Sequence, residues 1–194
     1  MNPEFNFCFK GERNYVQGAD IVIKLLEYFS NKNITELDLK FNGVVSTNLV
    51  LLDGNEAGNL KVNVRFLQDN VVRVMQLVEN DKKINCRNEY NEEDIIGRTD
   101  LDFDNQQISL KERTDFSLCE NFVAMNKVLL QKIYPEVAEK WYFTRLELNK
   151  PVPDDELITV KLIKNFNFRL VKSDILLADE KIGSVYFTLL KEKR

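Results

Sequence analysis

The sequence predicts an α+β fold made of two copies of one small unit, and three observations support this. A charged segment at residues 10–14 leads into an apolar helix expected at 19–29, and a similar segment at 111–114 leads into a second helix expected at 122–134. Each helix is followed by strand-like segments and by no further long helix. The 194 residues, 44% of them hydrophobic, suffice for two small domains with a substantial interior.

The first half reads as one strand, one helix and a run of strands. Residues 5–9 alternate large aromatic residues with smaller ones, as a half-buried strand does. The helix carries a wide apolar stripe, which predicts that protein surrounds most of it. The stripe is Ile21, Val22, Leu25, Leu26 and Phe29. Further strands are expected at 34–39, 44–52, 62–66, 71–78 and 84–90, with tight turns at 69–70 and 80–83.

The second half repeats this order. A short strand is expected at 108–111, and Ser117 with Glu120 three residues later matches a capping box, in which each side chain bonds to exposed amides at a helix start. The helical stripe is Phe122, Met125, Leu129 and Ile133. Strands are expected at 141–148, 157–164, 166–177 and 182–190, with the last hairpin turn at 179–181.

Acidic residues dominate the segment between the halves, where Arg98 is the one base in 91–105. Asp100, Asp102 and Asp104 have the spacing of a calcium loop, but Lys111 stands where a bidentate glutamate is needed. We therefore expect no metal site. The predicted domains are 1–92 and 106–194, joined by an acidic linker at 93–105.

Composition argues against several classes of partner and location. The net charge of −4 and the pI of about 5.1 offer no basic field for nucleic acid. Cys8, Cys86 and Cys119 are widely spaced and form no CxxC pair, so neither a disulfide framework nor a zinc site is predicted. The opening residues lack the pattern of a signal peptide, and no apolar run is long enough to cross a bilayer. We expect a soluble cytoplasmic protein with no membrane association.

The element order resembles the hotdog fold, in which a curved sheet wraps a central helix. Two such units in one chain are similar to a double hotdog, with an antiparallel curved sheet around two central helices. The resemblance covers residues 5–90 and 106–191. The second half, whose last strand contains residues 183–187, fits best. It implies membership of the acyl-thioester dehydratase and thioesterase superfamily, with ligands carried on coenzyme A or acyl carrier protein. It also implies a pocket where the units meet, beside the start of a central helix.

Carried onto this chain, the resemblance places the site at 13–20, where amides at the helix start can polarise a thioester carbonyl. Asn14, Tyr15, Gln17 and Gly18 are the expected ligand-binding residues there, and Asp20 and Gln17 are the catalytic candidates. In the second half the corresponding ligand-binding candidates are Ser117, Glu120 and Asn121.

One departure bears on catalysis, because the chain has no histidine and family members commonly use one as the base. Asp20 is the remaining candidate base, although an acidic residue in a first helical turn is also favoured by the helix dipole alone. Glu120 has an alternative role in the capping box, and Cys119 lacks a histidine that would activate it.

Three hypotheses follow. The first is a protein that binds acyl-CoA or an acyl carrier protein thioester, with thioesterase- or dehydratase-like activity. The second is a hotdog pseudoenzyme that acts as a binding or assembly partner in lipid metabolism, and the third is an unrelated α+β binding module. No cofactor is expected, and a homo-oligomer stays open.

Overall fold

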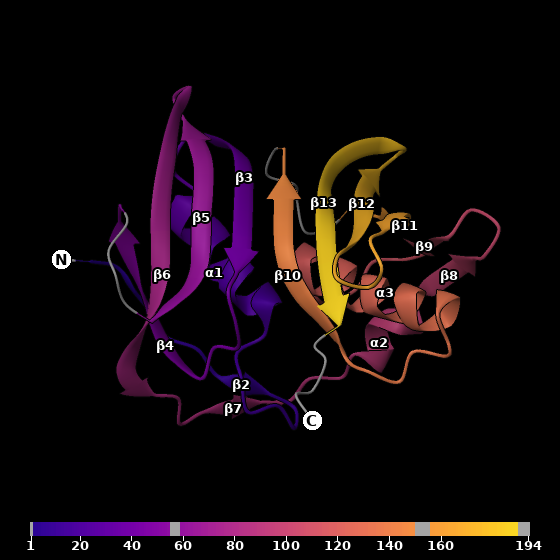
Figure 1. Cartoon of the computed structure of the whole chain (residues 1–194), viewed down its shortest axis with the longest axis horizontal. Coiled ribbons are helices and arrows are strands. Elements are labelled where there is room, and N and C mark those ends of the chain that lie inside the picture. Colours follow the sequence, from indigo (N-terminus) through magenta and orange to yellow (C-terminus); the bar gives the residue numbers. More distant parts are fainter. Residues whose placement is uncertain (1, 55–58, 150–155, 190–194) are drawn as a thin grey trace. The chain divides into compact units, whose positions relative to one another are not determined.

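The structure is a computed structural model, and it describes residues 2–54, 59–149 and 156–189. The chain divides into two compact units (Figure 1). The first unit comprises 1–91 with 147–151, and the second comprises 92–146 with 152–194. Each unit is described by itself below.

The first unit contains one long helix and an antiparallel sheet. Its strands are hydrogen-bonded in the order β1-β4-β6-β5-β3. A separate parallel pair joins β2 to β7. The elements are β1 (Glu4–Phe5), β2 (Phe9–Lys10), α1 (Gly18–Phe29), β3 (Ile34–Phe41), β4 (Thr47–Asp53), β5 (Leu60–Gln68), β6 (Val71–Lys83) and β7 (Arg87–Asn88).

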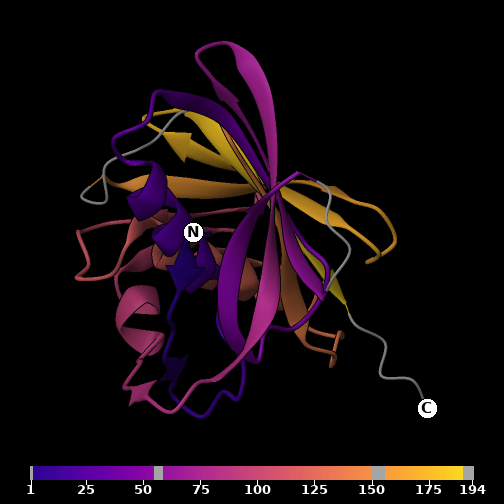
Figure 2. The same cartoon turned by 90° about the vertical axis from the view of Figure 1, so that its left-hand side faces the viewer.

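Helix α1 buries the apolar stripe that the sequence predicted, except for Leu26, which is half-buried. Phe29, the last residue of the helix, is 2% exposed, and the centroid of its ring lies 4.6 Å from that of Phe66 in β5. Figure 2 shows the twisted strands of this unit, coloured violet to magenta, beside the indigo helix. The contact joins the helix to the inner face of β5, whose buried residues alternate with less buried ones as a one-sided strand requires.

The structure confirms one predicted turn of the first unit and corrects the other. Asp69 and Asn70 both have positive φ, 51° and 64°, between paired strands β5 and β6, which is the conformation of a two-residue hairpin turn. The turn predicted at 80–83 is wrong, because β6 continues to Lys83, which pairs with Thr47 of β4. The polar residues of this stretch lie on an exposed part of a long strand.

Two predicted strands are shorter than expected. The strand expected at 5–9 is interrupted, because β1 ends at Phe5 and β2 begins at Phe9. Between them, the buried backbone N–H of Phe7 donates to Asn48 Oδ1 at 2.8 Å. The strand expected at 84–90 is reduced to β7, two exposed residues. A side-chain acceptor has therefore replaced a strand partner at Phe7.

The second unit also contains one long helix and an antiparallel sheet, in the order β10-β13-β12-β11-β9-β8. Its long helix packs against β9, β11 and β13. The elements are α2 (Glu93–Ile96), β8 (Thr99–Asp102), β9 (Gln107–Leu110), α3 (Leu118–Ile133), β10 (Trp141–Leu148), β11 (Ile158–Asn165), β12 (Val171–Leu177) and β13 (Glu180–Leu189).

The acidic linker predicted at 93–105 is wrong, because this segment is structured. It forms α2 and β8, and β8 pairs with β9. Ile95 is fully buried, so the segment belongs to a core while its charges face outward. Hydrogen bonds from the side chain and backbone of Asn105 hold the pKa of Asp102 below its usual range and fix the turn after β8.

Two boundaries in the second unit differ from the prediction. Helix α3 begins at Leu118, directly after the predicted cap Ser117. The strand expected at 166–177 begins only at Val171, since Asn167 and Phe168 have left-handed φ values of 53° and 59° and turn the chain.

Candidate site at the start of helix α1

The first turn of α1 lacks a side-chain cap. Gln17 is the N-cap residue with φ −67° and ψ 141°, and its carbonyl accepts the backbone N–H of Asp20 at 3.1 Å. Its side chain makes no capping bond and is only 8% exposed. Within the described part of the chain, Nε2 of Gln17 has no hydrogen-bond partner. A buried amide donor therefore lies at the positive end of a helix, where its desolvation is not compensated by protein.

Asp20, the candidate catalytic base, is held by an ion pair. Lys10 Nζ donates to Asp20 Oδ1 at 2.5 Å, and the two side chains are 15% and 14% exposed respectively. This contact ties β2 to the first turn of α1. The carboxylate is therefore engaged structurally, in addition to its favourable position near the helix dipole.

The start of α3 is capped instead by its own side chains. Ser117 Oγ accepts the backbone N–H of Glu120 at 3.2 Å, and Glu120 Oε2 accepts the backbone N–H of Ser117 at 3.0 Å. Asn121 is 1% exposed, accepts a hydrogen bond from Thr114 Oγ1 at 2.8 Å and donates to the carbonyl of Phe116 at 3.3 Å. The three second-half candidates thus satisfy the protein's own polar groups, and the capping box is confirmed.

Of the remaining first-half candidates, Asn14 and Tyr15 lie on the loop that leads into α1, and Gly18 is the first residue of the helix. Asn14 is exposed, whereas Tyr15 and Gly18 are half-buried. Arg87 holds this loop: its Nη1 donates to the carbonyls of Gly11 at 2.5 Å and Arg13 at 2.8 Å, and its Nη2 donates to Asn14 Oδ1 at 3.1 Å. The loop conformation is therefore set from outside its own sequence.

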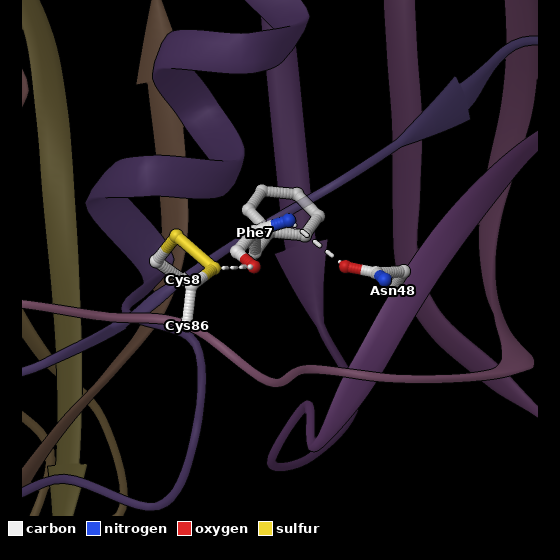
Figure 3. The surroundings of a disulfide bond; sticks show 4 residues. All are labelled: Phe7, Cys8, Asn48 and Cys86. Atoms are coloured by element: carbon white, nitrogen blue, oxygen red, sulfur yellow. Dashed lines mark hydrogen bonds between the residues drawn. A yellow bond between two sulfur atoms is a disulfide. The ribbon is translucent and has the colours of Figure 1, made fainter.

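A disulfide fastens the same region (Figure 3). Cys8 and Cys86 are bonded although 78 positions separate them, and their Cα atoms lie 4.8 Å apart. The prediction that the cysteines form no disulfide is thus wrong. It rested on sequence spacing alone, whereas the pairing of β2 with β7 brings the two cysteines together. Cys119 is buried and forms no disulfide. The cytoplasmic location stays a prediction, and it loses the support that it took from the cysteines.

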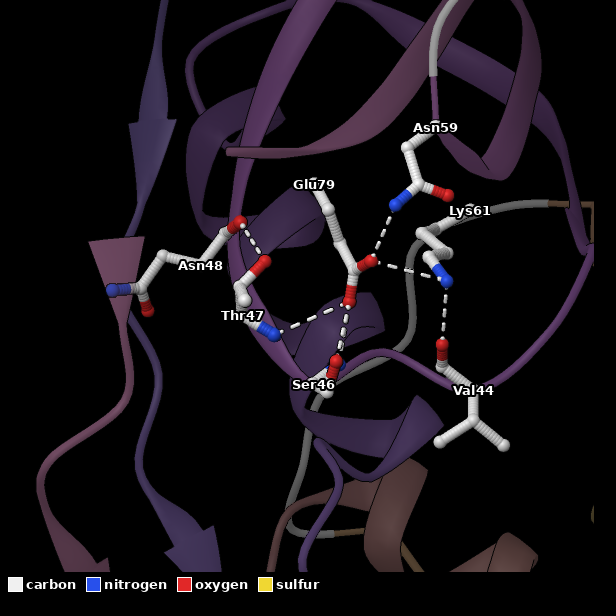
Figure 4. A network of polar contacts seen from close by, with 7 residues as sticks. All are labelled: Val44, Ser46, Thr47, Asn48, Asn59, Lys61 and Glu79. Carbon is white, nitrogen blue, oxygen red and sulfur yellow. Dashed lines mark hydrogen bonds and ion pairs between the residues drawn. The ribbon is translucent and has the colours of Figure 1, made fainter. Parts of the chain in front are cut away.

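A second polar cluster, centred on Glu79 of β6, is shown in Figure 4. Its Oε1 accepts the backbone N–H groups of Ser46 at 2.6 Å and Thr47 at 3.2 Å. Its Oε2 accepts from Asn59 at 2.8 Å and lies 3.1 Å from Lys61 Nζ. Burial acts to raise the pKa of Glu79, but hydrogen bonds from Ser46 and the contact with Lys61 outweigh it and hold the pKa below its usual range. The cluster joins β4, β5 and β6 and is structural.

Within the described ranges, no group of three or more His, Cys, Asp or Glu side chains is placed to hold a metal ion. None of the helices described is long and apolar enough to span a membrane. A depression of about 390 Å³ on the first unit contains none of the predicted site residues. It is lined by Glu4, Phe5, Asn6, Lys24, Glu27 and Tyr28.

The sequence reasoning missed Arg87 and the two bonded cysteines. Arg87 acts through the distant loop at 11–14, and nothing in its own neighbourhood indicates that contact. One signal was available, because Cys8 and Cys86 each lie in a segment predicted as a strand, and paired strands bring cysteines within bonding distance.

Comparison with known proteins places the fold. No model of a known protein family matches the chain, and no curated protein matches it. Among solved structures, the dehydratase domain of PpsC from Mycobacterium tuberculosis matches with a TM-score of 0.53 and 9% identity, over 99% of this chain and 93% of that one. The same domain in complex with C12:1-CoA gives 0.52 and 8%, over 98% and 93%. The TesB protein of Mycobacterium avium subspecies paratuberculosis gives 0.50 and 8%, over 92% and 88%.

These likenesses cover nearly the whole chain at very low identity, so they establish its fold. They confirm the fold predicted from the order of elements and favour it over an unrelated α+β module. The chain therefore has the hotdog α+β fold.

Proposed function

We propose that this protein binds an acyl thioester at the start of helix α1. The main support is the side chain of Gln17, which is nine-tenths buried and whose Nε2 has no hydrogen-bond partner among the described residues. An amide N–H₂ and the first-turn backbone amides together suit a carbonyl oxygen, which accepts hydrogen bonds and carries partial negative charge. The bound C12:1-CoA of the PpsC dehydratase domain supports this ligand class.

The contrast between the two helix starts supports the choice of α1. At α3, side chains of Ser117 and Glu120 satisfy the first-turn amides, whereas α1 has no side-chain cap. A helix start without an internal acceptor is the one that a ligand oxygen can complete. We assign Gln17 and Gly18 to the carbonyl oxygen of the thioester, and Asn14 and Tyr15 to its flanks. A pocket shared between the two units stays a prediction.

Two functions share this binding step. In hydrolysis, Asp20 would accept a proton from water as the water oxygen bonds to the carbonyl carbon, and the carbon–sulfur bond would then break to release the thiol. The ion pair between Asp20 and Lys10 and the absence of histidine both favour the second function, binding without turnover as a partner in lipid metabolism. Acyl carrier protein as carrier, homo-oligomerisation and a cytoplasmic location remain predictions.

A binding titration tests the proposal. Two ligands are compared. One is an acyl-pantetheine thioester, which carries the carbonyl, and the other is the matching thioether, which keeps the shape of the thioester side chain but cannot be hydrolysed. Gln17→Met removes the amide and keeps the side-chain length, so we expect thioester affinity to fall about tenfold, the equivalent of one buried hydrogen bond. Gln131→Met, at an exposed position of α3, is the matched control and should leave the affinity unchanged.

Release of thiol from the thioester separates the two functions. Release that disappears in Asp20→Asn while binding persists would assign hydrolysis, and saturable binding without release would assign the binding role. Equal thioester affinity in wild type and Gln17→Met would contradict the assignment of the site itself.

A further inference from the structure

We propose that the Cys8–Cys86 disulfide is a redox-controlled clamp on the loop that enters α1, and that its reduction loosens the thioester site. This inference rests on the proposed function for its effect on binding. The clamp segment, residues 84–91, lies against the loop at 10–17. The disulfide is the covalent contact between the clamp segment and the chain ahead of α1.

The other contacts of the clamp segment include hydrogen bonds at exposed positions and the half-buried Tyr90 ring, whose centroid lies 5.3 Å from Lys10 Nζ and 5.4 Å from Arg13 Cζ. The backbone N–H groups of Phe9 and Gly11 donate to the carbonyls of Cys86 at 3.1 Å and Asn88 at 3.0 Å. Arg87 donates to Gly11, Arg13 and Asn14, as described above. The pairing of β2 with β7 comprises two residue pairs, and both β7 residues are exposed.

Exposed hydrogen bonds of this kind compete with water and open easily on their own. The disulfide changes this balance because it removes the freedom of two segments that are 78 positions apart to separate. With the bond intact, Arg87 stays within reach of the loop carbonyls. With the bond reduced, the clamp segment can leave the loop. The residues ahead of Gln17 then lose the hydrogen bonds from Arg87 and keep the one from the Val16 N–H to the Val45 carbonyl.

The second unit contains a similar arrangement without a disulfide. Arg98 donates through Nη1 to the carbonyl of Arg113, and the backbone N–H of Lys111 donates to the carbonyl of Arg98 at 2.9 Å. These contacts correspond to Arg87 with Arg13 and to Gly11 with Asn88. There the following helix is fixed by its own capping box. The disulfide therefore marks the helix start that has no side-chain cap.

Access to the bond is one-sided, because Cys86 is exposed and Cys8 is half-buried. A thiolate of a dithiol reductant attacks the Cys86 sulfur, the protein S–S bond breaks, and Cys8 leaves as a thiolate that takes up a proton. The second thiol of the reductant then attacks the mixed disulfide and releases Cys86 as a thiol. Two electrons pass to the protein, and the reductant leaves as a disulfide.

Hydrogen–deuterium exchange of the full chain tests the clamp without any ligand. The oxidised protein is compared with protein reduced by dithiothreitol, and a non-reducing digest first verifies the linked Cys8 and Cys86 peptides. We expect amides of 10–17 to exchange at least about tenfold faster after reduction, while amides of 111–116 keep their rate as an internal control. Equal exchange at 10–17 in both states, or a digest without linked peptides, would overturn the inference.

Binding of the acyl-pantetheine thioester connects the clamp to the site. We expect the reduced protein and Cys86→Ser to bind the thioester about tenfold more weakly than the oxidised protein. In the control Cys119→Ser, reduction should weaken binding as it does in wild type. If the oxidised protein binds no thioester, the proposed function fails while the exchange result still decides the clamp. If oxidised and reduced protein bind equally well, the clamp does not control the site.

Discussion

At the scale of single residues, Glu79 shows how one carboxylate organises three strands. Its oxygens accept hydrogen bonds from Ser46, Thr47 and Asn59 and contact Lys61, and its side chain is only 9% exposed. Its pKa is lower in the folded protein than its usual value. The unfolded chain therefore binds the proton more tightly, and the stabilisation by Glu79 is complete above the unfolded pKa and is lost as pH falls through the folded pKa.

Replacement of Glu79 by glutamine should therefore destabilise the protein at neutral pH. We expect a loss of about 1–3 kcal/mol in the free energy of unfolding at pH 7, because charge-assisted hydrogen bonds are replaced by weaker ones. The difference from wild type should shrink at an acid pH below the folded pKa, where the wild-type carboxyl is protonated as well. Urea denaturation at both pH values measures this.

Glu27→Gln is the matched control for Glu79→Gln. Glu27 pairs with Lys24, but its side chain is 59% exposed, so the pair should contribute less than about 1 kcal/mol. Equal destabilisation by the two variants would contradict the assignment of Glu79 as a strand-joining residue.

At the scale of elements, the two long helices begin differently. Ser117 and Glu120 complete a capping box at α3, whereas Gln17 at α1 makes no side-chain cap. Local sequence predicted the capping box, since both of its members lie within one turn. It could not predict that the loop ahead of α1 is bonded to Arg87, which lies 74 positions from Arg13 and 73 from Asn14.

Ser117→Ala tests the contribution of the capping box. The backbone N–H of Glu120 loses its acceptor, so we expect a loss of about 1 kcal/mol in the free energy of unfolding. Ser30→Ala, which removes an exposed hydroxyl bonded to the Glu27 carbonyl at the end of α1, should change stability by less than about 0.5 kcal/mol. Chemical denaturation of both variants decides, and a larger effect at Ser30 would contradict the role given to Ser117.

At the scale of the whole molecule, the sequence predicted those structural features that are determined by residues close together along the chain. The two long helices and the turn at Asp69 and Asn70 follow from local periodicity and turn chemistry. The errors share another cause. The charge of segment 93–105 predicts a linker, although one buried residue, Ile95, fixes the segment to a core. The disulfide depends on β2 and β7 lying side by side, which no local pattern specifies.

The absence of histidine gives a prediction for the whole chain. With 27 basic and 31 acidic residues and no histidine, no side chain has an ordinary pKa between 6 and 8. Binding through the Gln17 amide and backbone amides involves groups that do not titrate there. We therefore expect the affinity of oxidised protein for an acyl-pantetheine thioester, which carries no phosphate, to stay constant from pH 6 to pH 8. Calorimetric titration across this range measures it. A transition with a midpoint inside the range would require a shifted carboxyl or thiol at the site, and would favour a base acting on the substrate over binding by neutral amides.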